Sequence, residues 1–269
     1  MNEFKKTVFV VALLSSLLIL AMTVIANATG MPSISAKSAI LYEPEQGHVL
    51  YQKNAHQRLP MASTTKIMTA IIALEHLKPD EQVRIPKEAT AIEGSSVYLK
   101  EGETLSVEDL LYSLMLRSAN DAAVALAYAV SEDIYGFSKL MNQKATQLGL
   151  SDTSFQNPHG LDSSDHYTTA HDLAVITAYA LKDPYFREIC STYKYSFTTE
   201  EGPRLVVNHN KMLKSYSGAI GVKTGYTKTS GRCLVSAAER EGKILICVTL
   251  DAPSDWSDHT ALLDYGFAI

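Results

Sequence analysis

The chain has two kinds of hydrophobic pattern, one typical of β-strands at its two ends and one typical of helices between them. Near the N-terminus, the apolar-rich runs SAILYEP and GHVLYQKN predict two β-strands joined by a turn at Glu45 to Gly47. Near the C-terminus, GRCLVSAAER and GKILICVTL predict a second hairpin that turns at Arg240 to Gly242. We therefore expect β-structure at both ends of the chain.

Helical spacing of apolar residues begins in the segment PMASTTKIMTA. Ile67, Ile71, Leu74 and Leu77 recur on one face of a helix, and Ser63 stands at its N-cap or in its first turn. This pattern predicts a helix that is packed against the rest of the protein.

Further helices are predicted through the middle of the chain. Residues 104–150 are helical almost throughout, and Ser106 and Asp109 are in capping relation at the start. After a loop, the run AHDLAVITAYAL predicts another helix, opened by Thr169 and Asp172, before strand signals resume. The last run, SDHTALLDYGFAI, predicts a terminal helix.

This order of elements predicts an α+β fold. The N-terminal hairpin is expected to join the C-terminal strands in one antiparallel sheet flanked by helices, with a mostly helical insertion between its two halves. The chain shows neither internal repeats nor a linker.

The first 28 residues differ from the rest in kind. Lys5 and Lys6 precede an uncharged apolar run at residues 7–26, and the ANA sequence that ends at Ala28 is typical of a signal-peptidase site. The run also has about the ~20 residues that span a bilayer, so an uncleaved anchor is the alternative. In either case we expect residues 29–269 to lie outside the cytoplasm.

Composition narrows the classes of function. The 269 residues carry a net charge of −5 without a basic cluster beyond the N-terminus, which argues against a nucleic-acid partner. No glycine-rich phosphate loop follows a strand and no residues have metal-ligand spacing, so no cofactor is expected.

Three cysteines are too few for a disulfide framework. Free thiols are expected, with a bridge between Cys233 and Cys247 across their hairpin as the alternative.

Ser63 and Lys66 suggest nucleophilic chemistry. Residues three apart on a helix lie about 5 to 6 Å from each other, so the amine can reach the hydroxyl. A lysine can take the proton of a serine only while its amine is neutral, a form that burial and a second cation favour. The same spacing recurs at Ser191 and Lys194, so the pair alone is a weak signal.

Two further triplets strengthen the interpretation. Ser118 to Asn120 reads SAN in a turn between two helices, and Lys223 to Gly225 reads KTG in a predicted strand. Ser-x-x-Lys, Ser-x-Asn and Lys-Thr-Gly in this order are the signature of penicillin-binding proteins and related β-lactamases. Ala119 in place of aspartate in the middle triplet suits the peptidase branch.

The chain resembles the D-alanyl-D-alanine carboxypeptidases of the low-molecular-mass penicillin-binding protein family along essentially its whole length after the leader. LMLRSANDAAVALA, FQNPHGLDSSDHYTTAHDLA and IGVKTGYTKTSGRCLVSAA are similar to that family's stretches around the three motifs. The resemblance implies the serine β-lactamase/DD-peptidase-like fold for a single catalytic domain at 29–269.

The resemblance implies a role for each motif residue. Ser63 is the acyl-accepting nucleophile, and Lys66 is the base that removes its proton. Lys223 supplies the second cation in the same pocket. Ser118 relays a proton to the leaving amine, and Asn120 holds the substrate backbone and the base.

It also implies how the substrate is held. The backbone N–H groups of Ser63 and Tyr226 form the oxyanion hole. Gly225 lets the substrate lie close to the strand, and Thr224 offers a hydroxyl to the terminal carboxylate. Better-known relatives have arginines at the position of His209 and within DAPSDWSDH, and Arg232 is a candidate substitute for reading that carboxylate. The other histidines are expected to be surface or loop residues.

The implied reaction removes the terminal D-alanine from peptidoglycan stem peptides without a cofactor, and β-lactams act as covalent inhibitors. A serine β-lactamase is the nearest alternative, but the chain has no glutamate between Asp133 and Arg187 to serve as a deacylating base. A non-catalytic penicillin-binding scaffold is the other alternative.

The chain stops at Ile269 without the β-rich domain of many relatives, so membrane attachment would rest on the N-terminal segment. The DAPSDWSDH ending resembles sporulation-associated members.

Overall fold

Five antiparallel strands form the central sheet, in the order β2-β1-β9-β8-β7. The computed structural model describes residues 30–199 and 202–269, so the leader predicted at 1–28 lies outside the described residues. Leu41 pairs with Cys247 across β1 and β9, which confirms that the N-terminal hairpin joins the C-terminal strands. The strands are β1 (Ser38–Glu43), β2 (His48–Lys53), β7 (Ala219–Thr227), β8 (Gly231–Arg240) and β9 (Lys243–Leu250).

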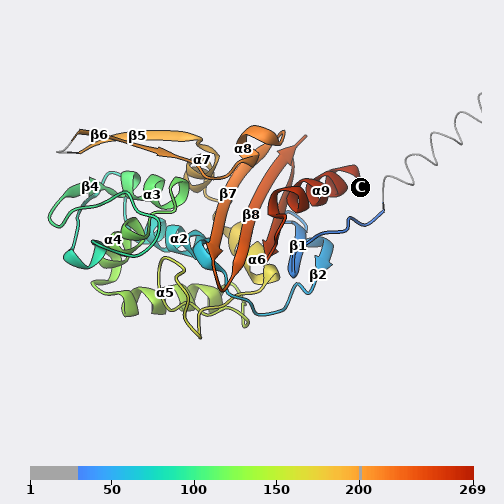
Figure 1. The fold of residues 1–269 in the computed structure, drawn as a ribbon, viewed down its shortest axis with the longest axis horizontal. Coiled ribbons are helices and arrows are strands. Elements are labelled where there is room, and N and C mark those ends of the chain that lie inside the picture. Colours follow the sequence, from blue (N-terminus) through green and yellow to red (C-terminus); the bar gives the residue numbers. More distant parts are fainter. Residues whose placement is uncertain (1–29, 200–201) are drawn as a thin grey trace, which may run out of the picture.

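Helices cover both faces of this sheet (Figure 1). α9 (Asp255–Ala268) packs on one face, against β8, β9 and β1, whereas α6 (Ala170–Ala180) packs on the other. Side chains of β9 alternate between the two layers, because Leu245 lies in the core beneath α9 and Ile246 lies in the larger core on the opposite face. Burial on both faces explains the uninterrupted apolar run from Ile244 to Val248 in this strand.

The helical insertion lies beside the sheet and confirms the predicted α+β fold (Figure 1). Its capping residues act as predicted, since Ser106 Oγ accepts the Asp109 backbone N–H at 3.0 Å and Thr169 Oγ1 accepts that of Asp172 at 3.0 Å. Its main helices are α2 (Lys66–His76), α3 (Val107–Leu116), α4 (Asn120–Ser131) and α5 (Ile134–Gln147). Shorter elements nearby are η1 (Ala62–Thr65), η2 (Lys87–Ala89), β3 (Gln82–Arg84) and β4 (Thr104–Ser106).

Two features differ from the predicted pattern. Between α6 and the strands that follow lies a helix that was not predicted, α7 (Pro184–Ser191), which begins with an Asp183 cap and a proline in its first turn. Its buried residues, Phe186, Ile189 and Cys190, follow helical spacing, so the local pattern does contain this helix. The following strands, β5 (Lys194–Thr199) and β6 (Gly202–Val207), form a separate two-stranded sheet, and α8 (Met212–Ser215) leads back to β7.

The cysteines are unpaired, and the alternative of a bridge in the C-terminal hairpin is wrong. Cys233 belongs to the core on the α6 side of the sheet, and Cys247 belongs to the core beneath α9. Side chains on opposite faces of a sheet cannot be joined by a disulfide.

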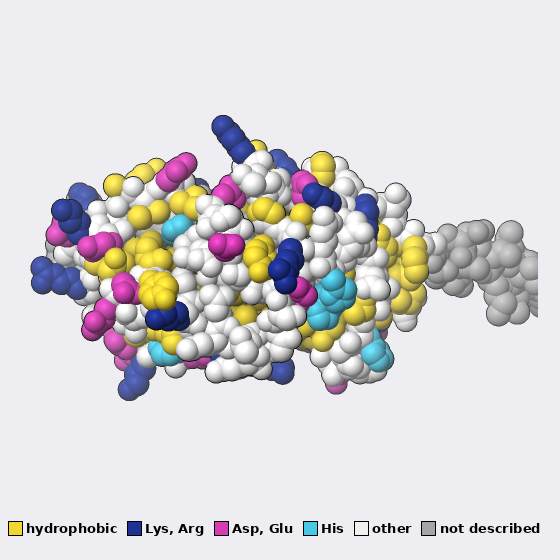
Figure 2. Space-filling view, turned by 90° about the horizontal axis from the view of Figure 1, so that it is seen from below, with side chains coloured by type: hydrophobic (Ala, Val, Ile, Leu, Met, Phe, Trp, Pro, Cys, Tyr) yellow, Lys and Arg dark blue, Asp and Glu magenta, His cyan; other side chains and the backbone are white. Residues whose placement is uncertain are grey.

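Three further observations concern the surface charge, the helices and the residues that could bind a metal. Figure 2 shows acidic and basic side chains interspersed over one face of the molecule. Within residues 30–199 and 202–269, no helix combines the length and apolarity required to cross a bilayer, and no group of three histidine, cysteine or carboxylate side chains could hold a metal ion.

Candidate active site

Ser63 and Lys66 lie on consecutive turns of one helical stretch. Ser63 is in the 3-10 turn η1, and Lys66 is the first residue of α2. Ser63 makes no capping hydrogen bond, so its expected position in the first turn is confirmed and the N-cap alternative is wrong. Its hydroxyl is therefore not occupied as a cap. The residue before it, Ala62, has a φ of +46°, a left-handed conformation that alanine rarely adopts.

Lys66 is fully buried, and its amine has three neighbours. Nζ donates to Asn120 Oδ1 at 2.7 Å and to the backbone oxygen of His159 at 2.6 Å, and it lies 3.0 Å from Ser63 Oγ. The carbonyl and amide oxygens can only accept, so a neutral amine uses its two N–H bonds there. Its lone pair then points to the Ser63 hydroxyl, which is the geometry that a base needs.

The surroundings favour that neutral amine. Burial, followed by the charge of Lys223, lowers the pKa of Lys66 well below its usual value, although Asp121 acts in the opposite direction. Burial also lowers the pKa of Lys223 to about 7. Lys223 is 1% exposed, and its Nζ donates to the Thr224 backbone oxygen at 2.8 Å. The two lysines therefore share one dry region, in which the charge of Lys223 favours the neutral form of Lys66.

Ser118 and Asn120 come from the turn between α3 and α4. Ser118 is 5% exposed and has a φ of +64°, which marks a second strained backbone position at the site. Asn120 is the first residue of α4, and its Nδ2 donates to the Glu93 backbone oxygen at 2.6 Å. This contact fixes the side-chain amide so that Oδ1 faces Lys66.

β7 brings the Lys-Thr-Gly triplet to the serine. It is the edge strand of the sheet, and η1 packs against it. A Cβ on Gly225 would stand 3.0 Å from the Ser63 backbone nitrogen and 3.2 Å from the Met61 backbone oxygen. Only glycine leaves this space open, so the backbone N–H of Ser63 can face the cleft.

A loop that contains Asn157 to Gly160 supports the pair from the other side. Thr69 Oγ1 donates to the Pro158 backbone oxygen at 2.6 Å, next to the His159 carbonyl that accepts from Lys66. Gly160 has a φ of +92°, and a Cβ there would stand 1.9 Å from the Ala62 backbone oxygen. The loop therefore touches η1 backbone to backbone.

Two buried histidines of this loop region were not expected. His159 is 9% exposed and His166 is 3% exposed, and burial lowers the pKa values of these rings to about 3 and about 4, respectively. His259, a residue of α9, is also fully buried. His159 and His166 are loop residues, as expected, although both are buried; for His259, which lies in a helix and is buried, the expectation of a surface or loop position is wrong. The final packing, not local polarity, decides their burial.

His166 is connected to the serine turn through a chain of hydrogen bonds. Its Nδ1 accepts the Gln156 backbone N–H at 3.0 Å, so the neutral ring carries its proton on Nε2. Nε2 donates to Thr65 Oγ1 at 2.7 Å, and Thr65 Oγ1 donates to the Ala62 backbone oxygen at 2.8 Å. This chain supports the strained residue that precedes Ser63. The HYTT sequence gave no signal for it.

The predicted residues meet at one cleft of about 360 Å³. Lys66, Asn120 and Lys223 are buried next to it. The cleft also contains Lys211 and Trp256, which the sequence did not single out, and a guanidinium nitrogen of Arg232 lies 3.9 Å from the carboxylate of Asp255. The predicted residues that line it are Ser63, Ser118, Thr224, Gly225, Tyr226 and Arg232.

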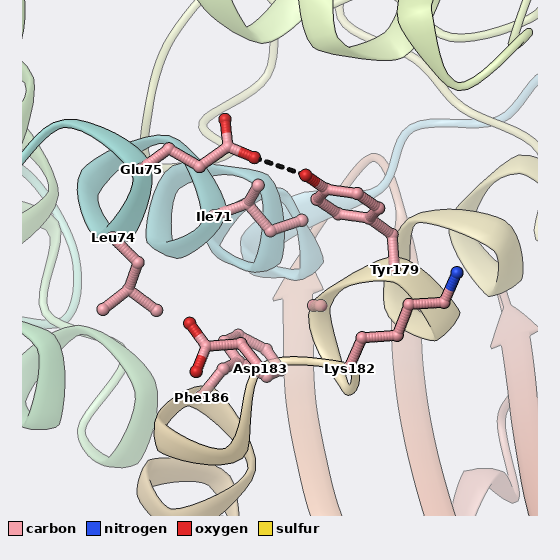
Figure 3. Close-up of a pocket in the computed structure, with 8 residues that line it drawn as sticks. Ile71, Leu74, Glu75, Tyr179, Lys182, Asp183 and Phe186 are labelled. Carbon is pink, nitrogen blue, oxygen red and sulfur yellow. Dashed lines mark hydrogen bonds between the residues drawn. The ribbon is translucent and has the colours of Figure 1, made fainter.

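A second pocket, of about 310 Å³, lies between α2, α6 and α7 (Figure 3). The Tyr179 hydroxyl donates to Glu75 at 2.6 Å, and Glu75 forms an ion pair with Lys144 at 2.7 Å. Its carboxylate is thus already paired. None of the predicted site residues lines this pocket, so the chemistry is confined to the cleft beside β7.

Comparisons with known proteins agree with this geometry. A family model described as D-alanyl-D-alanine carboxypeptidase matches residues 25–254. The D-alanyl-D-alanine carboxypeptidase DacF of Bacillus subtilis is 38% identical over 87% of this chain, which spans 62% of that relative. The D-alanyl-D-alanine carboxypeptidase of Streptomyces sp. strain K15 is 37% identical over 91% of both chains.

Solved structures are similar over nearly the same range. The crystal structure of the Streptomyces K15 DD-transpeptidase has a TM-score of 0.85 at 37% identity, covering 89% of this chain and all of that one. The D-alanyl-D-alanine carboxypeptidase of Mycobacterium tuberculosis has a TM-score of 0.85 at 33% identity, covering 89% and 94%.

Proposed function

The chain belongs to the D-alanyl-D-alanine carboxypeptidase family of serine peptidases, and we propose that it removes the terminal D-alanine of peptidoglycan stem pentapeptides through an acyl-enzyme on Ser63. The observation that carries the proposal is the fully buried Lys66 amine, 3.0 Å from the Ser63 hydroxyl, with its other two contacts made to fixed acceptors.

The proposed acylation step begins with a proton transfer. Lys66 takes the proton of the Ser63 hydroxyl while Oγ attacks the carbonyl carbon of the penultimate D-alanine. The negative charge that develops on the carbonyl oxygen is stabilised by the backbone N–H groups of Ser63 and Tyr226. Gly225 keeps the approach to the first of these groups free of side-chain atoms.

The second half of the step breaks the peptide bond. The tetrahedral intermediate collapses, and the nitrogen of the terminal D-alanine leaves with a proton that returns from Lys66 through the Ser118 hydroxyl. A water molecule then attacks the ester on Ser63, with Lys66 again taking the proton, and restores the free serine.

We assign the terminal carboxylate to Thr224 and Arg232, which line the same cleft. Asp255 lies 3.9 Å from the guanidinium and holds it within the cleft without fully covering it, since the Arg232 side chain is 55% exposed. Arg232→Ala should raise KM for a D-Ala-D-Ala peptide about tenfold and change kcat much less. An unchanged KM would rule out this role.

Transpeptidation is a second candidate, because a structural relative at 37% identity is described as a DD-transpeptidase. The acyl-enzyme is common to both reactions, and an amine would replace water in the second step. The β-lactamase alternative would need a base that speeds release of a β-lactam. The loop contact to Lys66 is a backbone carbonyl, and residues 134–186 contain no glutamate.

Two parallel measurements test the proposal. Intact-mass analysis after exposure to penicillin should show a persistent adduct, and the purified protein should release D-alanine from an acyl-D-Ala-D-Ala peptide. Ser63→Ala should show neither. Rapid loss of the adduct would favour the β-lactamase. Absence of both signals in the wild type would favour a scaffold, and cross-linked product with an added amine would favour the transpeptidase.

We also propose that the protein acts outside the cytoplasmic membrane, where peptidoglycan lies. The leader-like residues 1–28 support this location. N-terminal sequencing of the protein from cells should find Thr29 if the leader is cleaved or Met1 if it remains as an anchor. Full protection from external protease in wall-less cells would contradict export.

A further inference from the structure

Asp121 is a buried residue to which the mechanism above gives no role. It lies in the first turn of α4, directly after Asn120, and is 2% exposed. Taking a carboxylate out of water costs free energy unless hydrogen bonds within the protein replace its solvation. The donors that replace the water therefore show which part of the chain Asp121 holds in place.

Three donors to this carboxylate come from residues 93–99, which we call the wall segment because Ser95 lines the catalytic cleft. The Ser96 hydroxyl donates to Oδ2, as does the backbone N–H of Leu99 at 3.1 Å. The backbone N–H of Val97 also donates to Oδ2 at 3.1 Å. These donors precede the carboxylate by 22 to 25 positions in the chain, so it ties two distant parts of the sequence together.

The wall segment depends on this support because its backbone is strained. Tyr98 has a φ of +60°, in the left-handed region that a bulky residue rarely adopts. Such a conformation persists only where the surrounding contacts impose it. Ser96 Oγ, which Asp121 fixes, accepts the Tyr98 backbone N–H at 2.8 Å. Loss of the carboxylate would therefore release the path that the wall segment follows.

The wall segment in turn fixes Asn120. The backbone N–H of Asn120 donates to the Ser95 backbone oxygen at 2.7 Å, and its Nδ2 donates to that of Glu93 at 2.6 Å. Gly94 lies between these two acceptors, and a Cβ there would stand 2.8 Å from Asn120 Nδ2. Because its backbone and its amide nitrogen are both held, Asn120 directs Oδ1 to the Lys66 amine, 2.7 Å away.

Asp121 also acts on Lys66 through its charge. Its donors from the wall segment are neutral, so they solvate the carboxylate without cancelling the negative charge. Asp121, on α4, raises the pKa of Lys66, whereas Lys223, on β7, lowers it. The rings of His159 and His166 also interact with Lys66, but burial lowers their pKa values to about 3 and about 4, so both are neutral at pH 7.

We propose that Asp121 is a positioning residue for acylation, a role that rests on the proposed function. Its carboxylate ties the wall segment to α4, and the wall segment holds Asn120 so that Oδ1 accepts one N–H of Lys66. The lone pair of the neutral amine then stays directed at Ser63 Oγ. Asp121 therefore acts through Asn120 and not on the reacting atoms.

Asp121→Asn tests this role with a side chain of the same size. The amide is neutral and has a single acceptor oxygen, so the bonds to the wall segment weaken. The rate constant for acylation by penicillin should fall about tenfold, while the dissociation constant of the preceding complex changes much less. Loss of the negative charge lowers the pKa of Lys66 further, so the rising limb of the acylation rate should move to lower pH. Stopped-flow measurements over penicillin concentration and pH give these quantities.

Ser96→Ala separates the geometry from the charge. It removes a donor to the carboxylate and the acceptor of the Tyr98 N–H, but the charge of Asp121 remains. Acylation should slow about threefold, and the rising limb should stay at the same pH. In the double variant with Asp121→Asn, the loss should be smaller than the product of the two single losses, because both changes act through the wall segment.

Asp172→Asn is the matched control. Asp172 is also a buried residue in the first turn of a helix, α6, and its carboxylate accepts the Thr153 hydroxyl at 2.8 Å. Its contacts do not include the wall segment or Asn120. The variant should lower the free energy of unfolding, measured by chemical denaturation, but should keep the acylation rate within about twofold of the wild type.

Three outcomes would overturn the proposal. They are an unchanged acylation rate in Asp121→Asn, a rising limb that does not move in that variant, and an equal loss of rate in Asp172→Asn. If Asp121→Asn does not fold, Ser96→Ala decides, and a wild-type rate in that variant would overturn the proposal as well.

The wild type separates this failure from that of the proposed function. A penicillin adduct and D-alanine release in the wild type, together with unaffected variants, would contradict only the role of Asp121. Absence of both signals in the wild type would contradict the reaction itself.

Discussion

The segments 63–66 and 191–194 have the same serine-x-x-lysine spacing but opposite environments. The first continues as helix from η1 into α2, so the hydroxyl and the amine lie 3.0 Å apart. In the second, Ser191 ends α7 and Lys194 begins β5, and both side chains are exposed. Ser191 Oγ donates instead to the Glu188 backbone oxygen. Spacing brings two groups together only where the backbone remains helical between them.

Burial is the second difference. Lys66 is enclosed by α4, by β7 and by the loop that contains His159, three segments that are far apart in the chain. Lys194 is exposed at a strand end. Water solvates a lysine ammonium strongly, so only the enclosed amine has its pKa driven down. The reactive pair is therefore a property of the packing around a helix turn.

The largest effect should come from breaking the pair at its base. Lys66→Gln removes the proton acceptor and should lower the rate of acylation by penicillin about 10³-fold, measured by stopped-flow or by intact mass. Lys194→Gln should leave the rate within about twofold, because that amine lies in water. Equal losses in the two variants would show that the buried amine has no special role.

The loop that encloses Lys66 can be displaced without touching either catalytic group. Gly160→Ala should lower the free energy of unfolding by about 3 kcal/mol and slow acylation, because the new methyl group meets the Ala62 backbone oxygen. The matched control is Gly242→Ala, where φ is +82° but no atom lies within 4 Å. It should cost only about 1 kcal/mol. Chemical denaturation measures both.

The pH dependence of the free energy of unfolding tests the effect of burial on Lys223. The folded pKa of Lys223 is about 7 against an ordinary 10.5, so between these values the unfolded chain binds the extra proton. The resulting loss of folding stability is absent above pH 10.5, grows as pH falls, and is complete below about pH 7. Lys223→Met removes it, so its stability gain over the wild type should grow by up to about 1.4 kcal/mol per pH unit between pH 10 and 7.

Lys194→Met, which removes an exposed lysine, is the control for that curve. The activity of Lys223→Met provides a second readout. Since the Lys223 charge lowers the pKa of Lys66, its loss should move the rising limb of the acylation rate to higher pH. Two outcomes would contradict electrostatic coupling between the two lysines. One is a rising limb of the acylation rate that stays at the same pH, and the other is a stability difference between Lys223→Met and the wild type that does not vary with pH.

The smallest effect tests the hydrogen bonds that hold the serine turn. Thr65→Val interrupts the chain from His166 to the Ala62 backbone oxygen and should lower kcat about tenfold with little change in KM. Thr65→Ser keeps the hydroxyl and should retain kcat within about threefold. A similar loss in both variants would point to packing of the methyl group as the cause.

Much of the fold could be predicted from local pattern. The two terminal hairpins, the capped helices and the turn that carries Ser118 depend on neighbours a few residues apart, and these are visible in the sequence. α7 was missed although its Asp183 cap, its first-turn proline and the helical spacing of Phe186, Ile189 and Cys190 are all visible in the sequence. The separation of β5 and β6 from the main sheet depends on pairing partners that no local pattern names.

The candidate site likewise contains residues that the sequence predicted and residues that it did not. The order of the three motifs predicted which side chains meet, and the cleft brings Ser63, Ser118 and Gly225 together. The role of the buried His166, and the groove that Tyr98, Arg117 and His209 line, had no local signal. Their contacts join residues that are about 20 to 100 positions apart in the chain.

The amino-acid sequence by itself determined the elements, the candidate nucleophile and the residue types available around it, because caps, turns and helical spacing act over a few residues. The tertiary structure alone decided that Lys66 is dry, that Lys223 shares its surroundings, and that Arg117 faces an open groove. Solvation and Coulomb interactions depend on every atom within several ångströms, and folding draws most of those atoms from distant segments.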